Sequence, residues 1–302
     1  MALAILCAYF PFIPLLLLLL VSYFFLLRLR NNKHEKPPLK LPPGPTKLPI
    51  VGNLHHLGTL PHQSLLQLSK KFGPIMYLKL GSMPTVVVSS AETAKEFLKT
   101  HDLDCCTRAS FTSPSKLSYD CRDIAFNPYG ALWRELRKIC IIEFFSSKKV
   151  QMFESIRREE VDRMIESISC TSQSDVNLSA LLLSLSNDIT CRAALGRRFY
   201  GGGDACLQRM LKESQDVFAG LFFADYLPVL GWLDVLTGMR GKLEKNFREL
   251  DEFYQKVIKE HMDERRSHGE GEDTMDALLR IQKEATHLTM EHIKGILMVY
   301  FS

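Results

Sequence analysis

The amino terminus of this 302-residue chain is one long uncharged apolar stretch. No Asp, Glu, Lys, Arg or His occurs from Ala2 to Leu27, and residues 15–20 are all leucine. A helix of about 20 apolar residues is enough to cross the hydrocarbon core of a bilayer. We therefore predict a transmembrane anchor over residues 1–27, so the rest of the chain must fold as a unit tethered at one end.

A cleaved secretory signal is the alternative interpretation of this stretch. Such a signal has a basic start, a short apolar region and a cleavage site with small residues. Here the chain starts Met-Ala-Leu-Ala, the apolar region is long, and Arg28 follows it without an Ala-x-Ala site. Length and flanking residues both favour the anchor.

The charges that follow the stretch predict its orientation. They are Arg28, Arg30, Lys33, Lys36 and Lys40. Positive flanks stay in the cytosol, so we expect the following domain on the cytosolic face. The sequon at Asn177 should then remain unglycosylated, and the eight cysteines should be thiols rather than disulfides.

Residues 28–49 form a basic and proline-rich hinge. Six prolines fall between Pro37 and Pro49. Proline fixes its own φ and restricts the residue before it, so this segment should be stiff and extended. A flexible linker is the simpler interpretation, but a stiff connector after an anchor would set how the domain of residues 50–302 sits on the membrane.

Composition excludes several classes of function. Charged residues make up 24% and hydrophobic residues 46% of the chain, as in ordinary globular proteins, and the net charge is only +4. No basic stripe with aromatics indicates nucleic-acid binding. The cysteines form no Cys-x-x-Cys pair and the histidines no zinc spacing, so no metal ligands are assigned.

Hydrophobic periodicity predicts a mainly α protein with a small amino-terminal β-sheet, an α+β plan. Residues 75–80 and 85–89 are β-rich runs joined by Gly81-Ser82-Met83-Pro84, which suits a hairpin. Residues 103–130 show no hydrophobic periodicity and should form a long loop. The predicted helices cover residues 63–72, 91–101, 131–145, 147–170, 178–196, 204–224, 238–267, 273–285 and 289 onward.

Ordered motifs along the chain resemble the amino-terminal part of one family. They are Leu41-Pro42-Pro43-Gly44-Pro45, residues 48–54 (LPIVGNL), residues 123–130 (DIAFNPYG), residues 133–138 (WRELRK), residues 225–228 (DYLP) with 232–234 (WLD), and residues 292–298 (HIKGILM). In this order they resemble a plant microsomal cytochrome P-450 monooxygenase of the 71-type group. The resemblance covers residues 1–298 and ends within the family's central oxygen-activating helix.

The resemblance implies haem b as the cofactor, held in part through Trp133 and Arg137. Positions i and i+4 of a helix share one face, so an indole N–H and a guanidinium can reach the same ligand. In the family the ligand would be the haem propionates. A core tryptophan beside a solvated arginine is the simpler interpretation of the pair, and the surrounding motif favours the haem role.

Two segments resemble the family's substrate-contacting regions. Leu117, Ile124 and Phe126 are the candidates in the loop 103–127, and Phe222 and Phe223 are those near the end of the 204–224 helix. For each of them, a core or membrane-facing apolar role is an equal alternative. Ala109 departs from the proline usual in the family and affects only local loop geometry.

The family's catalytic residues are not among residues 1–302. No cysteine lies in the late Phe-x-x-Gly-x-Arg-x-Cys-x-Gly loop that supplies the iron thiolate, and the Ala-Gly-x-Asp/Glu-Thr break is missing. Two Glu-x-x-Arg matches, Glu154/Arg157 and Glu160/Arg163, are better explained as surface pairs on a helix. We expect about three fifths of a family member, a truncated cytochrome P-450 fold without turnover of its own, and the sequence leaves open whether this fold retains haem.

The resemblance further implies an NADPH-dependent reductase, membrane lipid and a small lipophilic plant metabolite as partners, and residence in the endoplasmic reticulum membrane. A non-catalytic membrane-tethered helical scaffold, or a pseudogene-like product, is the alternative. A membrane hydrolase is disfavoured, because neither Gly-x-Ser-x-Gly nor His-Glu-x-x-His occurs.

Overall fold

The computed structural model describes residues 22–23, 40–170, 175–198, 205–263, 272–284 and 288–301. The chain divides into two units, residues 1–43 and residues 44–302. The predicted anchor (residues 1–27, apart from Ser22 and Tyr23) and the hinge up to residue 39 lie outside the described residues. Among the described residues, no helix combines the length and apolarity needed to span a bilayer.

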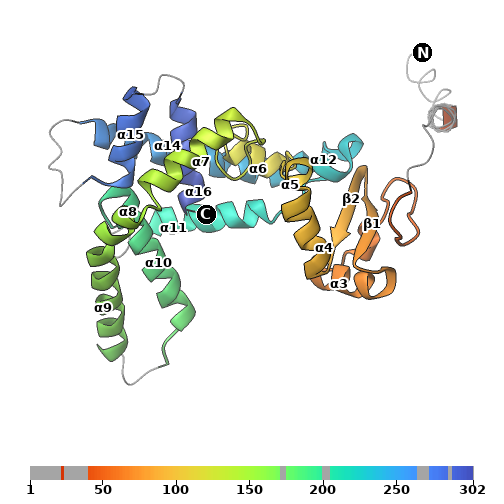
Figure 1. Ribbon diagram of the computed structural model, residues 1–302, viewed down its shortest axis with the longest axis horizontal. Helices are drawn as coiled ribbons and strands as arrows, with labels where there is room; N and C mark the ends of the chain where they lie inside the picture. The colour runs from red at the N-terminus through yellow and green to blue at the C-terminus, as the bar shows by residue number, and fades with distance from the viewer. Residues whose placement is uncertain are drawn as a thin grey trace, which may run out of the picture. The chain divides into compact units, whose positions relative to one another are not determined.

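The predicted β-hairpin lies in the first part of the second unit, after the 3-10 helix η2 (Leu54–His56) (Figure 1). Strand β1 (Ile75–Leu80) pairs antiparallel with β2 (Met83–Val88), so Ile75 lies opposite Val88 and Leu80 opposite Met83. Gly81 takes the left-handed conformation that the two-residue turn requires, with φ +63°. The hairpin is confirmed, with a tighter turn than the four residues predicted. The alternating residues Met76 and Leu78 of β1 are fully buried.

Helix α3 (Pro61–Phe72) precedes the hairpin, and several short helices follow it. They are α4 (Ala91–Lys95), a π-helical turn (Glu96–Thr100), α5 (Asp102–Cys105) and α6 (Thr112–Leu117). The prediction of a helix-free loop over 103–130 is therefore wrong for α5 and α6. These helices have only four and six residues, too few for a hydrophobic period to become visible in sequence.

The remaining elements are helical and follow the predicted order. They are α7 (Ala131–Glu143), α8 (Ser147–Met152), α9 (Glu154–Cys170), α10 (Leu178–Leu195), α11 (Ala205–Phe218), α12 (Phe223–Tyr226), η4 (Pro228–Leu230), α13 (Leu233–Leu236), α14 (Met239–Met262), α15 (Thr274–Glu284) and α16 (Met290–Phe301). The mainly α plan with a small sheet is confirmed.

Several predicted helices have different bounds in the structure, and two of these differences change how the chain is divided into helices. The helix predicted over 147–170 is broken at Phe153, and that over 204–224 ends at Phe218. Phe222 and Phe223 therefore do not end the long helix but start α12. The cause is the buried Asp234 carboxylate, which accepts the N–H of Phe223 at 2.7 Å and of Ala224 at 3.0 Å. This cap starts a separate short helix.

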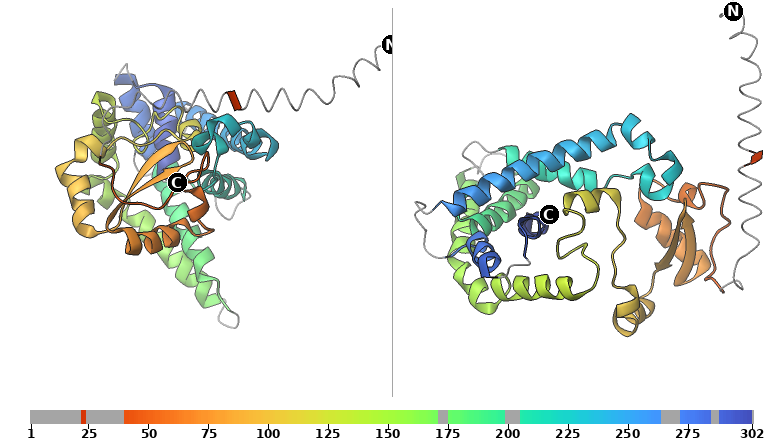
Figure 2. Two further views of the ribbon diagram at one scale, coloured as in Figure 1. Left: turned by 90° about the vertical axis from the view of Figure 1, so that its right-hand side faces the viewer. Right: turned by 90° about the horizontal axis from the view of Figure 1, so that it is seen from above.

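The core lies among α7, α10, α11, α14, α15 and α16 (Figure 2). Helix α14 contributes Leu243, Leu250, Tyr254 and Val257 to it and packs on α11, α13, α6 and α15. A buried polar pair crosses this core, because Ser214 donates to the Asn246 side chain at 2.9 Å. Helix α14 is thus the element on which much of the second unit is assembled.

Helices α9 and α10 lie side by side and are joined by a buried carboxylate. The Glu160 side chain is 2% exposed and accepts Arg192 Nη1 and Arg198 Nε, both at 2.6 Å. Burial raises the pKa of Glu160, but the two guanidiniums outweigh it and leave the pKa below its ordinary value. Glu154 bonds Arg158 at 3.0 Å. The prediction of two surface pairs is therefore wrong, because Glu160 is buried and both glutamates bond arginines other than those of the two Glu-x-x-Arg matches.

Candidate functional site

Trp133 and Arg137 lie on one face of α7, as their spacing predicts. The Arg137 guanidinium carbon is 5.2 Å from the centroid of the Trp133 ring, within the range of a cation–π contact. The indole is half-buried and the guanidinium is exposed. The helix therefore presents a positive group braced against an aromatic plane.

The Trp133 indole is already engaged with the preceding loop. Its Nε1–H donates to the carbonyl oxygen of Ile124 at 2.9 Å. Among the residues that the structure describes, Arg137 makes no ion pair or hydrogen bond. Of the two predicted propionate donors, Arg137 can receive an anion without losing a bond, whereas Trp133 would have to exchange one. The donor set fits a carboxylate ligand through Arg137 first.

The loop that leads to Ile124 contains three consecutive left-handed residues. Tyr119, Asp120 and Cys121 have φ values of +53°, +61° and +61°. Each L-residue in this conformation costs roughly 1 kcal/mol or more. Local hydrogen bonds offset part of the cost: Asp120 N–H to the Ser115 carbonyl at 2.8 Å, and Cys121 N–H to the Ser118 hydroxyl at 3.0 Å.

Asp123 is fully buried directly after this turn. Its Oδ1 accepts the N–H of Phe126 at 2.6 Å, and its Oδ2 is buried without a partner in the part of the chain described. Burial raises the pKa of Asp123 to about 6, although the N–H groups of Phe126 and its neighbours oppose this. Gly295 of α16 admits the loop, since a Cβ there would lie 3.3 Å from the Asp123 Cβ.

The predicted substrate contacts fall in three environments. Leu117 and Phe222 are 2% and 1% exposed and belong to the core, where Ile124 packs against the same cluster. Phe126 stacks on Phe218 with ring centroids 5.9 Å apart. Phe223 is 37% exposed. The structure thus gathers Leu117, Ile124 and Phe222 into one apolar cluster, and the contact role of all five residues stays a prediction.

Sequence reasoning missed the bonds that hold these segments together. Asp225 Oδ1 accepts both the N–H and the hydroxyl of Thr112, at 2.9 and 2.6 Å. Ser82 N–H of the hairpin turn donates to the Tyr226 carbonyl at 2.7 Å. These pairs are more than one hundred residues apart in sequence, so no local pattern reveals them. Asp123 could have been found, because an Asp at the start of a turn commonly caps its N–H groups.

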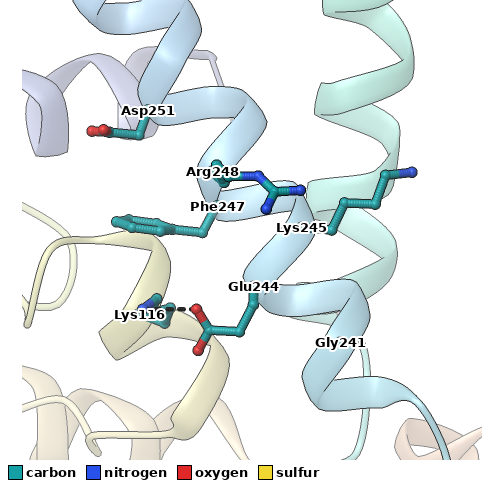
Figure 3. A pocket seen from close by; sticks show the side chains of 7 residues that line it. All are labelled: Lys116, Gly241, Glu244, Lys245, Phe247, Arg248 and Asp251. Carbon is teal, nitrogen blue, oxygen red and sulfur yellow. Dashed lines mark ion pairs between the residues drawn. The ribbon is translucent and has the colours of Figure 1, made fainter.

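A groove of about 380 Å³ lies between α6 and α14 (Figure 3). It is lined by Lys116, Gly241, Glu244, Lys245, Phe247, Arg248 and Asp251. Lys116 Nζ pairs with Glu244 at 2.9 Å and lies 4.6 Å from the Phe247 ring centroid. The groove contains both cations and anions, so its lining does not favour a ligand of one charge.

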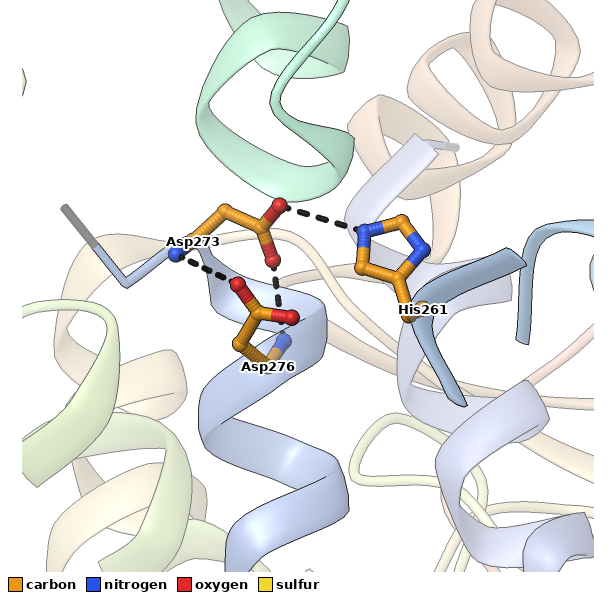
Figure 4. Close-up of side chains that lie close together, drawn as sticks. All are labelled: His261, Asp273 and Asp276. Atoms are coloured by element: carbon orange, nitrogen blue, oxygen red, sulfur yellow. Dashed lines mark hydrogen bonds and ion pairs between the residues drawn. The ribbon is translucent and has the colours of Figure 1, made fainter. Parts of the chain in front are cut away.

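His261, Asp273 and Asp276 each offer a ligand-type atom, and these atoms lie within 4.8 Å of one another (Figure 4). His261 Nε2 lies 3.1 Å from Asp273 Oδ2, and its Nδ1 lies 2.8 Å from the Val257 carbonyl oxygen. Asp273 Oδ1 accepts the N–H of Asp276 at 2.9 Å, which caps the start of α15. These bonds fasten the last turn of α14 to the first turn of α15, which explains the group without a metal ion.

The raised pKa of Asp123 predicts how stability depends on pH. The folded chain holds this proton up to about pH 6, whereas the unfolded chain releases it near the ordinary aspartate pKa of 3.8. The folded state therefore binds more protons between these values, and stability should fall as pH rises through this window. Asp123→Asn should remove that loss, which is at most about 3 kcal/mol.

The measurement is urea unfolding of both proteins at several pH values from 4 to 7. The difference in unfolding free energy should move in favour of Asp123→Asn as the pH rises. Parallel pH profiles for the two proteins would contradict a raised pKa at Asp123. Asp225→Asn is a suitable control, since Asp225 also accepts backbone and side-chain donors but is half-buried.

Comparison with known proteins supports the resemblance. The family model described as Cytochrome P-450 matches residues 42–302. Similar curated proteins include Cytochrome P-450 71A9 of Glycine max (49% identical, 94% of this chain, 58% of the relative), Strychnine-11-hydroxylase of Strychnos nux-vomica (47%, 92%, 56%) and Cytochrome P-450 71B37 of Arabidopsis thaliana (45%, 95%, 58%). The chain thus spans less than three fifths of the length of these relatives.

Proposed function

Since the chain belongs to the cytochrome P-450 family, we propose that residues 44–302 form the propionate-side part of a plant 71-type haem-thiolate monooxygenase. The observation that carries this proposal is the pairing of Trp133 and Arg137 on α7. An exposed guanidinium held in contact with an indole ring can bind a carboxylate, such as a propionate at the edge of haem.

Within such an enzyme the residues of this chain bind and orient rather than react. Bound haem with a cysteine thiolate supplies the oxygen chemistry, and the thiolate motif is not among residues 1–302. Arg137 would hold a propionate, and Trp133 would hold the loop that carries Ile124 and Phe126. Turnover therefore requires a thiolate and an electron-supplying reductase that these residues do not provide.

The proposed substrate is a small lipophilic plant metabolite. Leu117, Ile124 and Phe222 share one apolar cluster, and Phe126 lies against Phe218. One relative is named a strychnine 11-hydroxylase, which supports hydroxylation of a plant compound. Apolar walls of this kind exclude water and select for lipophilic ligands.

We also propose that the chain is held at the endoplasmic reticulum membrane, with the domain on the cytosolic face. The uncharged stretch of residues 1–27 supports this, together with the positive flank that follows it. A second support is the short segment 221–236. Its apolar side chains Leu221, Val229, Trp232, Val235 and Leu236 are each more than half exposed. An apolar patch of this kind suits contact with lipid.

Titration of the purified chain with hemin tests the role of Arg137. Arg137→Ala should raise the dissociation constant about tenfold, because one charge-assisted hydrogen bond to a carboxylate is lost. Arg134→Ala is the matched control, since Arg134 is also exposed and lies on the same helix. Its guanidinium carbon is 5.8 Å from the centroid of the Tyr129 ring instead of the Trp133 ring. This substitution should change the constant less than about twofold.

Equal effects of the two substitutions would contradict the propionate role. Absence of saturable hemin binding by the unsubstituted chain would favour the alternative function, a membrane-tethered helical scaffold. The buried hydrophobic cluster of the second unit supports this alternative, because it indicates that residues 44–302 pack around a core of their own side chains.

Expression in microsomes tests the membrane proposal. The chain should resist carbonate extraction, and protease added to intact microsomes should digest residues 44–302. Asn177, which caps α10 by accepting the Ala180 N–H at 3.0 Å, should carry no glycan. A protease-protected chain with a glycan at Asn177 would show the opposite orientation.

A further inference from the structure

The left-handed turn at residues 119–121 depends on support from outside the loop. Three consecutive non-glycine residues at positive φ are rare, and such strain persists only where the surroundings impose it. The local hydrogen bonds of the turn reach back only to residues 115, 116 and 118, all within the same segment. Contacts from other elements must therefore hold the conformation.

The main contact is the carboxylate of Asp251 on α14. Its Oδ1 accepts the Tyr119 hydroxyl at 2.8 Å and Lys294 Nζ of α16 at 2.6 Å, and its Oδ2 accepts Gln255 Nε2 at 2.6 Å. One side chain thus joins the loop to two helices. Hydrogen bonds to a charged acceptor are the stronger kind.

The charges around Asp251 keep these bonds in place. Burial raises the pKa of Asp251, but the bonds from Lys294 and Tyr119 outweigh it and leave the pKa below its ordinary value. Burial, with the neighbouring Asp251, also raises the pKa of Tyr119. The tyrosine therefore remains a donor and the aspartate an acceptor at neutral pH. The Tyr119 ring lies 5.2 Å from that of Phe247 and 5.6 Å from Lys294 Nζ.

Helix α16 provides a second attachment on the same face. Glu291 forms an ion pair with Arg122. The Arg122 carbonyl oxygen also packs closely against Gly295, because a Cβ at residue 295 would lie only 3.2 Å from that oxygen. Glu291, Lys294 and Gly295 are spaced three and four residues apart, so they share one face of the helix. The start of the turn is thus bonded to Asp251 of α14, which Lys294 of α16 also contacts, and the residue after the turn is paired with α16 directly.

The turn continues directly into the proposed ligand-contacting residues. Asp123 follows it, and the Ile124 carbonyl then accepts the Trp133 indole. We propose that Tyr119, Asp251 and Lys294 are positioning residues: their hydrogen bonds set the place of Ile124 and Phe126 and thereby the seat of Trp133. This proposal rests on the proposed function in one respect only, namely that the loop with Ile124 and Phe126 contacts the ligand.

A purely structural role for Asp251 makes a different prediction. If its carboxylate served only to join α14 to α16 through Lys294, removing the Tyr119 hydroxyl would leave the Trp133 environment unchanged. Tyr119→Phe separates the two cases, because it removes the bond to the loop and keeps Lys294 on Asp251.

The test uses Trp133 as an optical reporter. The chain has two tryptophans, so a Trp232→Phe background leaves Trp133 alone. In this background Tyr119→Phe and Asp251→Asn should each raise acrylamide quenching of Trp133 about twofold. Glu244→Gln is the matched control, since it removes the α6–α14 pair with Lys116, two turns along the same helix. It should leave quenching unchanged.

The measurement is made where circular dichroism shows every variant folded, and it needs neither hemin nor substrate. Its failure is therefore distinct from failure of the proposed function. Unchanged quenching in Tyr119→Phe overturns the proposal, as does an equal increase in Glu244→Gln. If Asp251→Asn does not fold, the comparison of Tyr119→Phe with Glu244→Gln decides alone.

Discussion

The hydrogen bond from the Trp133 indole to the Ile124 carbonyl is the constraint on which the candidate site depends. It joins α7 to the loop that lies against Gly295 of α16, and Arg137 keeps its cation–π contact with the same indole ring. A buried N–H that loses its partner costs about 1–3 kcal/mol, and a half-buried indole costs less, so the loop and the helix stabilise each other by a fraction of this amount. The same bond makes Trp133 primarily a brace and Arg137 the available cation.

Two buried carboxylates of this unit have pKa values shifted in opposite directions. Glu160 keeps its charge because two guanidiniums meet it between α9 and α10. Asp123 has only backbone N–H donors, and its second oxygen has no partner among the described residues. The first arrangement fixes two helices, whereas the second places an easily protonated group beside the proposed ligand loop.

Much of the fold could be predicted from the sequence, because long helices and the hairpin carry a strong hydrophobic period. The i, i+4 relation of Trp133 and Arg137 is local, and the structure reproduces it. The short helices α6 and α12 could not be predicted in this way. They depend on Asp225 and Asp234, whose carboxylates cap N–H groups brought close only by folding. The bond of Tyr119 to Asp251 spans 132 residues and has no local signal either.

The central claim is that this unit forms the propionate side of a haem-thiolate enzyme. The most direct measurement is the reduced carbon monoxide difference spectrum of a chimera. It would join this chain, through Met298, to the remaining carboxyl-terminal part of the Glycine max relative, with which it shares 49% identity. The account predicts a thiolate-type Soret band that Arg137→Ala weakens. A folded, membrane-bound chimera without haem, or one whose band is indifferent to Arg137, would contradict it.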